Sequence, residues 1–64
     1  MNKIREFREK ADLTQVELAL LLGVSNKAIS HYEVGNRMPS LDTIKKLATA
    51  LHCKPTDLFP VLAG

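Results

Sequence analysis

Four hydrogen-bonding side chains of different types stand close together near the middle of the chain. They are an amide, an ammonium, a hydroxyl and an imidazole, carried by Asn26, Lys27, Ser30 and His31. An asparagine amide pairs with adenine and a lysine ammonium donates to guanine, while hydroxyl and imidazole groups bond to base edges or phosphates. The chemistry that this set offers is hydrogen bonding to the edges of DNA bases.

A second set of polar residues flanks the first on both sides. Some of these residues stand where helices are expected to begin, and the free backbone N–H groups of a helix N-terminus attract phosphate. We therefore expect this set to contact DNA phosphates and to position the chain without reading sequence. Its members are Thr14, Gln15, Ser25, Asn36 and Arg37.

Catalysis has little support in the sequence. No Ser-His-Asp or Cys-His arrangement, paired carboxylates or phosphate-binding loop is visible, so we expect no catalytic residue and no enzyme activity. The single cysteine, Cys53, has no partner for a disulfide and no second cysteine near a histidine pair for a zinc site. We expect no metal, no cofactor and no small-molecule ligand.

Length and composition predict one small globular domain. The chain has 64 residues, 45% hydrophobic and 25% charged, so we expect a single domain over residues 1–64. The net charge of +2 permits binding to nucleic acid without requiring it. Charges are interspersed at the start, and no apolar run approaches the ~20 residues that span a bilayer, so we expect a cytoplasmic protein.

The elements that must position these side chains are helices, and the predicted fold class is all-α. Apolar residues recur at helical spacing, and capping residues or prolines mark most of the starts. Asp12, Gly23 and Gly35 follow predicted helix ends, where left-handed backbone is common. The five predicted helices cover about residues 3–11, 14–22, 25–34, 40–51 and 55–59.

The two short helices at about residues 15–34 form the most informative unit. A tight turn joins them, so the second helix should cross the first steeply, with Ala19 at the closest approach. Ile29 and Tyr32 would anchor the rear of the second helix, which leaves a polar front. Such a helix fits the major groove of B-DNA, which is about 12 Å wide.

The chain resembles the XRE family, the DNA-binding domains of phage repressor and Cro proteins. The resemblance covers about Ile4 to Phe59 and implies five helices, with the second and third as a helix-turn-helix motif. It implies that Gln15 touches a phosphate and that Arg8 pairs with Glu33. The matching segments are 4–6, 13–15, 17–19, 22–25, 29–30, 32–33, 35–37, 39–41, 47–48, 50–51 and 57–59.

The leading interpretation is a transcriptional regulator, a repressor of a near-palindromic operator, that binds double-stranded DNA as a homodimer. The resemblance implies dimers whose reading helices enter successive major grooves, about 34 Å apart. The expected dimer surface is the apolar C-terminal set, whose spacing suits a seam. That set is Leu58, Phe59, Val61 and Leu62.

Some residues depart from the family pattern. Val16, Leu20 and Leu21 stand where the family usually has polar residues, and Asp12 and His52 where it commonly has glycine. Val16 and Leu20 are one helical turn apart and would form an outward apolar stripe. This stripe supports an alternative, a protein-interaction module such as an antitoxin or inhibitor, with DNA binding secondary.

Overall fold

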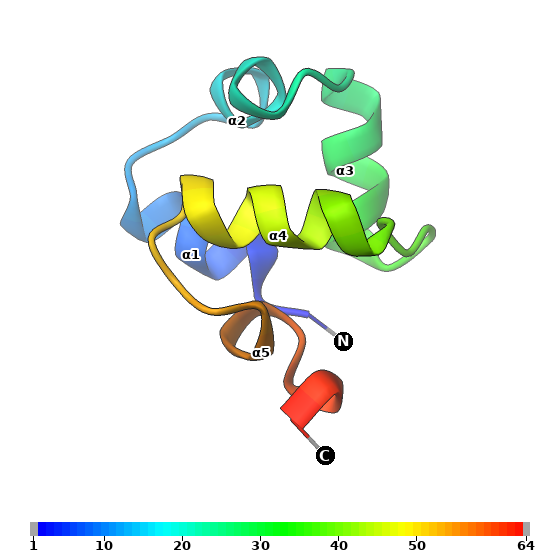
Figure 1. Cartoon of the computed structure of the whole chain (residues 1–64). Coiled ribbons are helices and arrows are strands. Elements are labelled where there is room, and N and C mark those ends of the chain that lie inside the picture. Colours follow the sequence, from blue (N-terminus) through cyan, green and yellow to red (C-terminus); the bar gives the residue numbers. More distant parts are fainter. Residues whose placement is uncertain (1, 64) are drawn as a thin grey trace.

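The computed structural model describes residues 2–63, and the fold is all-helical as predicted (Figure 1). Met1 and Gly64, the two ends of the expected domain, lie outside the described residues. Within the described part of the chain, five α-helices are followed by one 3-10 helix, η1. Their bounds are α1 Ile4–Lys10, α2 Gln15–Leu22, α3 Asn26–Val34, α4 Leu41–Ala50, α5 Pro55–Leu58 and η1 Pro60–Ala63.

The starts of α2, α3 and α4 are fixed by the capping residues that the sequence indicates. Thr14 Oγ1 accepts from the backbone N–H of Glu17 at 3.0 Å, and Glu17 Oε1 accepts from the Thr14 N–H at 2.8 Å. Ser25 and Ser40 hydroxyls accept in the same way at the start of α3 and α4. These bonds satisfy N–H groups that would otherwise lack a partner in the first helical turn.

Left-handed backbone ends α2 and α3, at Gly23 (φ 71°) and Gly35 (φ 80°). Asp12 (φ 59°) and His52 (φ 54°) also have positive φ. The predicted conformation of Asp12 is therefore confirmed. A residue with a Cβ is less stable in this left-handed conformation by roughly 1–2 kcal/mol than in ordinary helical backbone. Glycine has no Cβ, which explains why it suits positions 23 and 35.

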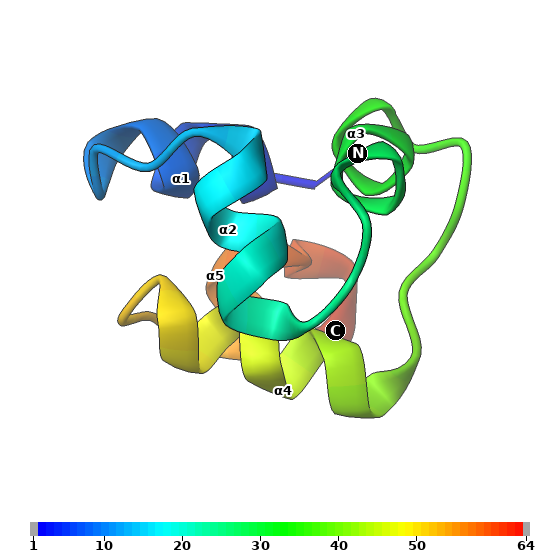
Figure 2. The ribbon, with the colours of Figure 1, turned by 90° about the horizontal axis from the view of Figure 1, so that it is seen from above.

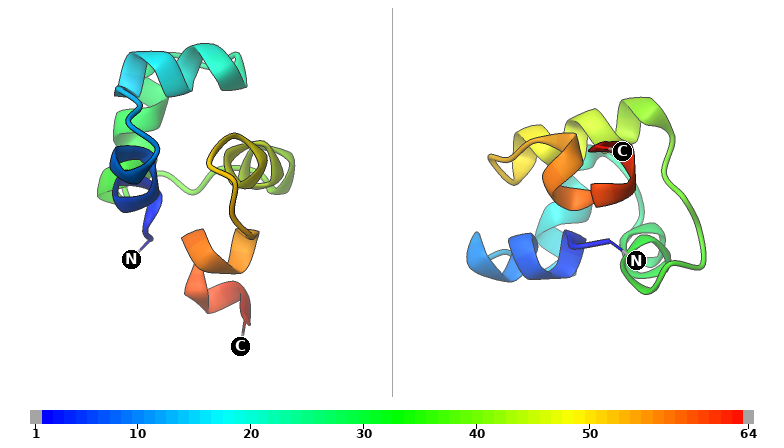
Figure 3. Two further views of the ribbon diagram at one scale, coloured as in Figure 1. Left: turned by 90° about the vertical axis from the view of Figure 1, so that its left-hand side faces the viewer. Right: turned by 90° about the horizontal axis from the view of Figure 1, so that it is seen from below.

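The helices form two layers joined at their ends. Figures 2 and 3 show α1 and α3 on one side of the molecule and α4 on the other. α2 spans the two layers at one end, and α5 with η1 lies at the opposite end. None of the helices between residues 2 and 63 is long and apolar enough to cross a bilayer.

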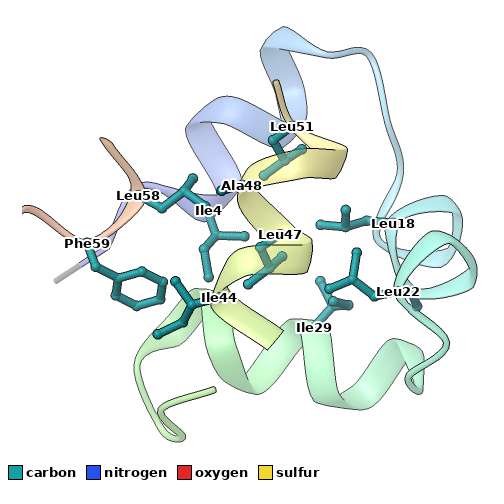
Figure 4. Packing of buried hydrophobic residues seen from close by; sticks show 11 residues of the cluster. Ile4, Leu18, Leu22, Ile29, Ile44, Leu47, Ala48, Leu51, Leu58 and Phe59 are labelled. Carbon is teal, nitrogen blue, oxygen red and sulfur yellow. The ribbon is translucent and has the colours of Figure 1, made fainter. Parts of the chain in front are cut away.

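Each of the five α-helices contributes one fully buried side chain to a shared core (Figure 4). Burying one such side chain stabilises a fold by about 1.5–3 kcal/mol. The core therefore depends on every helix, which fixes α3 relative to the rest of the chain. The five residues are Ile4, Leu18, Ile29, Leu47 and Leu58.

The expected dimer surface is wrong for two of its four residues. Leu58 is 0% and Phe59 4% exposed, because α5 is a single turn whose apolar side closes the core of the same chain. The Lys3 N–H donates to the Leu58 carbonyl at 2.8 Å and holds this turn against the start of α1. Val61 and Leu62 on η1 are exposed.

Leu41 differs from the other apolar residues on its side of α4. Its spacing places it in the apolar stripe of α4, yet its side chain is exposed, whereas Ile44 and Leu47 are buried. Leu41 is the first residue of α4, directly after the N-cap, so it lies at the edge of the surface that α4 packs on the core.

Candidate nucleic-acid interface

The turn between α2 and α3 holds the rear of α3 against the core. The Val24 N–H donates to the Ala19 carbonyl at 3.0 Å across this turn. Ala19 is buried, so the two helices approach closely where only a small side chain fits. Ile29 is fully buried behind α3, and Figure 2 shows α3 running at a steep angle to α2.

The front of α3 carries the four candidate base-contact residues, two of them close to its N-terminus. Asn26 and Lys27 are exposed, and Ser30 and His31 are half-buried. Glu33 is the sole acidic residue in the sequence of α3, and Arg8 pairs with its charge. A polar, uncharged or basic front of this kind can donate hydrogen bonds to base edges in a groove.

The start of α2 lies beside the start of α3. Asn26 lines one shallow hollow together with Thr14, Gln15 and Val16, although these residues belong to different helices. The structure thus brings the candidate base-contact residue Asn26 next to two candidate phosphate contacts. In the sequence, the whole of α2 lies between Thr14 and Asn26, so their proximity is a result of the fold.

A largely enclosed ion pair links α1 to α3. Two guanidinium nitrogens of Arg8 face the two carboxylate oxygens of Glu33, and Nη2 lies 3.3 Å from Oε1. The side chains are only 11% and 4% exposed, and the third nitrogen, Nη1, donates to the Leu13 carbonyl at 2.8 Å. This is the pair that the family resemblance implies. The hydrogen bond to Glu33 raises the pKa of Arg8, so the guanidinium stays charged.

Gln15 is tied to this ion pair. Its Nε2 donates to Glu33 Oε1 at 3.0 Å, so one carboxylate holds residues from α1 and α2. The bond uses one of the two amide hydrogens and leaves the other, with the amide oxygen, for an outside partner. Arg8, Glu33 and Gln15 together fix the N-terminal end of α2 relative to α3.

Thr14 and Ser25 serve first as helix caps. Each hydroxyl oxygen accepts a backbone N–H, and its own proton has no acceptor among residues 2–63. Both hydroxyls therefore remain able to donate outward. We expect both hydroxyls to contact phosphates, and their position at the starts of α2 and α3 is compatible with that role.

Asn36 and Arg37 follow the C-terminal end of α3. The Asn36 backbone N–H donates to the His31 carbonyl at 3.0 Å, and its side-chain amide lies 3.4 Å from His31 Nδ1. Asn36 thus braces a candidate base-contact residue. Arg37 is exposed and forms no ion pair with any described residue.

Asn2 is a positioning residue outside the predicted sets of site residues. Its Oδ1 accepts from the Ile4 N–H at 3.1 Å, and its Nδ2 donates to the Tyr32 carbonyl at 2.8 Å. One side chain thereby caps the start of α1 and binds the end of α3. An asparagine two residues before a helix signals the local bond. The contact with Tyr32, 30 residues away in sequence, has no local signal.

Candidate metal ligands do not converge. No group of three or more His, Cys, Asp or Glu residues that could hold a metal ion occurs over residues 2–63. Cys53 is half-buried against the core, and burial raises the pKa of its thiol, with a smaller effect of the Asp57 carboxylate.

These features define the class of the protein. Two short helices joined by a tight turn, with the second buried behind and polar in front, are a helix-turn-helix unit. A helix-turn-helix family model matches residues 4–58, and the chain belongs to that family, of the XRE (Cro/C1) type. Proteins of this family are DNA-binding transcriptional regulators.

Solved structures share this fold. The restriction-modification controller protein C.AhdI from Aeromonas hydrophila is 42% identical, with a TM-score of 0.82 over 89% of this chain and 86% of that one. The P22 c2 repressor, solved in complex with synthetic operator 9T, is 37% identical, with a TM-score of 0.81 over 84% of this chain and 82% of that one.

Some relatives are much longer than this chain. An HTH-type transcriptional regulatory protein of Pyrococcus furiosus is 40% identical over 60 residues. The match covers 89% of this chain and only 19% of that protein.

Proposed function

We propose that the protein is a repressor that binds a near-palindromic operator as a dimer, with α3 in the major groove of each half-site. The observation that carries the proposal is the division of α3 into a buried rear, anchored by Ile29, and a polar front. A helix fixed from behind presents its front side chains in one orientation. That orientation is what recognition of base edges requires.

The roles of the front residues follow from their chemistry. Asn26 pairs with adenine through its amide, and Lys27 donates to guanine O6 and N7. Ser30 and His31 complete the reading surface, with His31 braced by Asn36. Because Asn26 and Lys27 start the helix, they enter the groove first.

Phosphate contacts hold α3 in register. Gln15, oriented by Glu33, donates its free amide hydrogen to a phosphate at the edge of the groove. Thr14 and Ser25 donate their hydroxyl protons at the two helix starts, and Asn36 and Arg37 bind the backbone beyond the end of α3. The P22 c2 repressor, at 37% identity, was solved on an operator, which supports DNA as the ligand.

The proposed dimer surface is centred on η1. Val61 is 79% exposed and Leu62 is also exposed, and Val61 lines a hollow together with Met38 and Arg37 from the α3–α4 loop. Met38 is exposed too, so this end of the molecule offers apolar area to a second copy. The surface adjoins the C-terminal end of α3, which suits the placement of two reading helices in successive grooves.

The experiment that tests this function is selection of bound sequences from a randomised DNA pool by the purified chain at moderate salt. Enrichment of a palindrome with half-sites about one helical turn apart, bound by two chains, is the expected result. Binding without enrichment would leave electrostatic affinity alone and would contradict sequence-specific repression.

A further inference from the structure

The outward side of α2 carries exposed apolar residues, Val16, Leu20 and Leu21, beside Glu17, and its role in DNA binding does not explain them. Leu18, Ala19 and Leu22 face the core, whereas Leu20 and Leu21 on the other side are 77% and 63% exposed. A helix on the surface of a soluble domain usually pairs an apolar side with a polar one. Adjacent exposed leucines on an ordered helix offer apolar area that another molecule can cover.

Leu21 belongs to an open groove between α2 and α4. Figures 1 and 2 show α2 next to α4, at the end of the molecule opposite α5. Apolar atoms dominate the lining of the groove, and basic groups stand along it. Its lining residues are Leu21, Lys45, Lys46, Thr49, Ala50 and His52.

The charge along this groove is uncompensated. Lys45 and Lys46 are exposed, and neither takes part in an ion pair with any residue from 2 to 63. The lining holds no carboxylate. Asp42, one turn before Lys46 on α4, is the acidic residue of this helix, and it also forms no ion pair among the described residues. An occupant with acidic groups would meet complementary charge.

The groove lies away from the proposed DNA-binding surface. α4 is in the layer opposite α1 and α3 (Figures 2 and 3), and none of the residues that line the groove is a candidate DNA contact. A partner in this groove would therefore leave the candidate DNA contacts uncovered.

We propose that the α2–α4 groove binds an acidic amphipathic helix of a partner protein. Leucine-type side chains of that helix pack on Leu21 and Ala50, and its carboxylates pair with Lys45 and Lys46. This is the helix-in-groove mode of recognition, with apolar anchors one turn apart. A second copy of this chain does not fit, because a symmetric contact centred on the groove would bring the lysines of both copies together.

The test is a titration of the full chain, labelled with nitrogen-15, with synthetic peptides of about 15 residues, the length of a marginally stable helix. The probe peptide has leucines one turn apart and glutamates elsewhere. One control replaces its glutamates with lysines, and another replaces its leucines with serines. The probe alone should shift the backbone amide signals of Leu21, Lys46 and Ala50 saturably.

Variants locate the site. Lys45→Glu combined with Lys46→Glu, and separately Leu21→Glu, should each weaken binding of the probe about tenfold, because the first variant loses two exposed ion pairs and the second loses one apolar anchor. Leu62→Glu, on η1, is the matched control and should leave that affinity unchanged. All three sites are exposed, so the fold should persist in each variant.

Three results would overturn the proposal. Equal binding of the lysine peptide would show that charge has no role, and equal binding of the serine peptide would show that apolar packing has none. Loss of affinity for DNA in the Lys45→Glu, Lys46→Glu variant, with peptide binding unchanged, would instead assign the lysines to phosphate. Because the titration contains no DNA, its outcome does not depend on the proposed repressor function.

Discussion

Arg8 on α1 and Glu33 on α3 form an ion pair in which both side chains are almost enclosed, at 11% and 4% exposure. The guanidinium also binds the Leu13 carbonyl, and the carboxylate also accepts from Gln15. Each charge in the pair therefore has several polar partners, which compensates for the loss of hydration. The same carboxylate ties three segments of the chain together around the start of α2.

Removal of Arg8 should destabilise the fold strongly. Arg8→Ala leaves the Glu33 carboxylate enclosed without a counter-charge, and such a loss costs about 3–5 kcal/mol. The free energy of unfolding in urea measures it. Arg5→Ala is the matched control, because it breaks the exposed Arg5–Glu9 pair on the same helix and should cost under about 1 kcal/mol. Similar losses in the two variants would contradict the account.

Leu58 and Val61 should respond in opposite ways to substitution. Leu58→Ala opens a cavity in the core of the single chain and should lower the free energy of unfolding by about 2–5 kcal/mol. Val61→Glu should leave that energy within about 0.5 kcal/mol but place like charges in the proposed dimer surface. The Val61→Glu variant should therefore bind the operator with lower cooperativity between its two copies. Sedimentation on operator DNA measures this, and unchanged two-chain binding would exclude Val61 from the surface.

Local signals predicted the helices well. Thr14, Ser25 and Ser40 define helix starts through bonds to residues three positions away, so the sequence contains everything that determines them. Gly23 and Gly35 end helices by their own backbone preference. The predicted bounds of α2 and α3 agree with the structure for this reason.

Long-range contacts were harder to predict. Leu58 and Phe59 are apolar at helical spacing, and spacing alone does not say whether the apolar partner is the same core or a second chain. The Asn2 bond to Tyr32 joins residues with no shared pattern. The family resemblance implied the Arg8–Glu33 pair, which no local rule indicates.

His52 should limit stability through its backbone. It adopts φ 54° just after α4, where a Cβ is unfavourable by roughly 1–2 kcal/mol, while glycine costs about 0.5–1 kcal/mol in lost chain entropy. His52→Gly should therefore raise the free energy of unfolding by up to about 1.5 kcal/mol. Thermal unfolding of His52→Gly beside His52→Ala checks this. Alanine keeps the Cβ, so an equal gain in both variants would assign the effect to the imidazole.

Cys53 should make stability decrease at alkaline pH. Burial raises the pKa of its thiol in the folded chain, with a smaller contribution from Asp57. The folded state thus holds this proton more tightly than the unfolded chain, whose thiol ionises near pH 8.5. The resulting stability is fully present below that pH and is lost as the pH rises towards the folded pKa.

Unfolding in urea at pH 7 and above pH 9 tests the Cys53 prediction. Cys53→Ala should show a smaller alkaline loss than the wild-type chain, because it lacks the titrating thiol. Equal losses in the two proteins would show that burial of Cys53 does not affect its proton affinity.

The most direct test of the central claim is the affinity of Asn26→Ala, Lys27→Ala and Arg37→Ala variants for the selected operator and for random DNA. Asn26→Ala and Lys27→Ala should each lose about 1–3 kcal/mol on the operator, relax preference at one position and change little on random DNA. Arg37→Ala should weaken both and reduce the salt dependence by about one phosphate contact. Equal losses on the two DNAs for Asn26→Ala and Lys27→Ala would contradict reading of bases by α3.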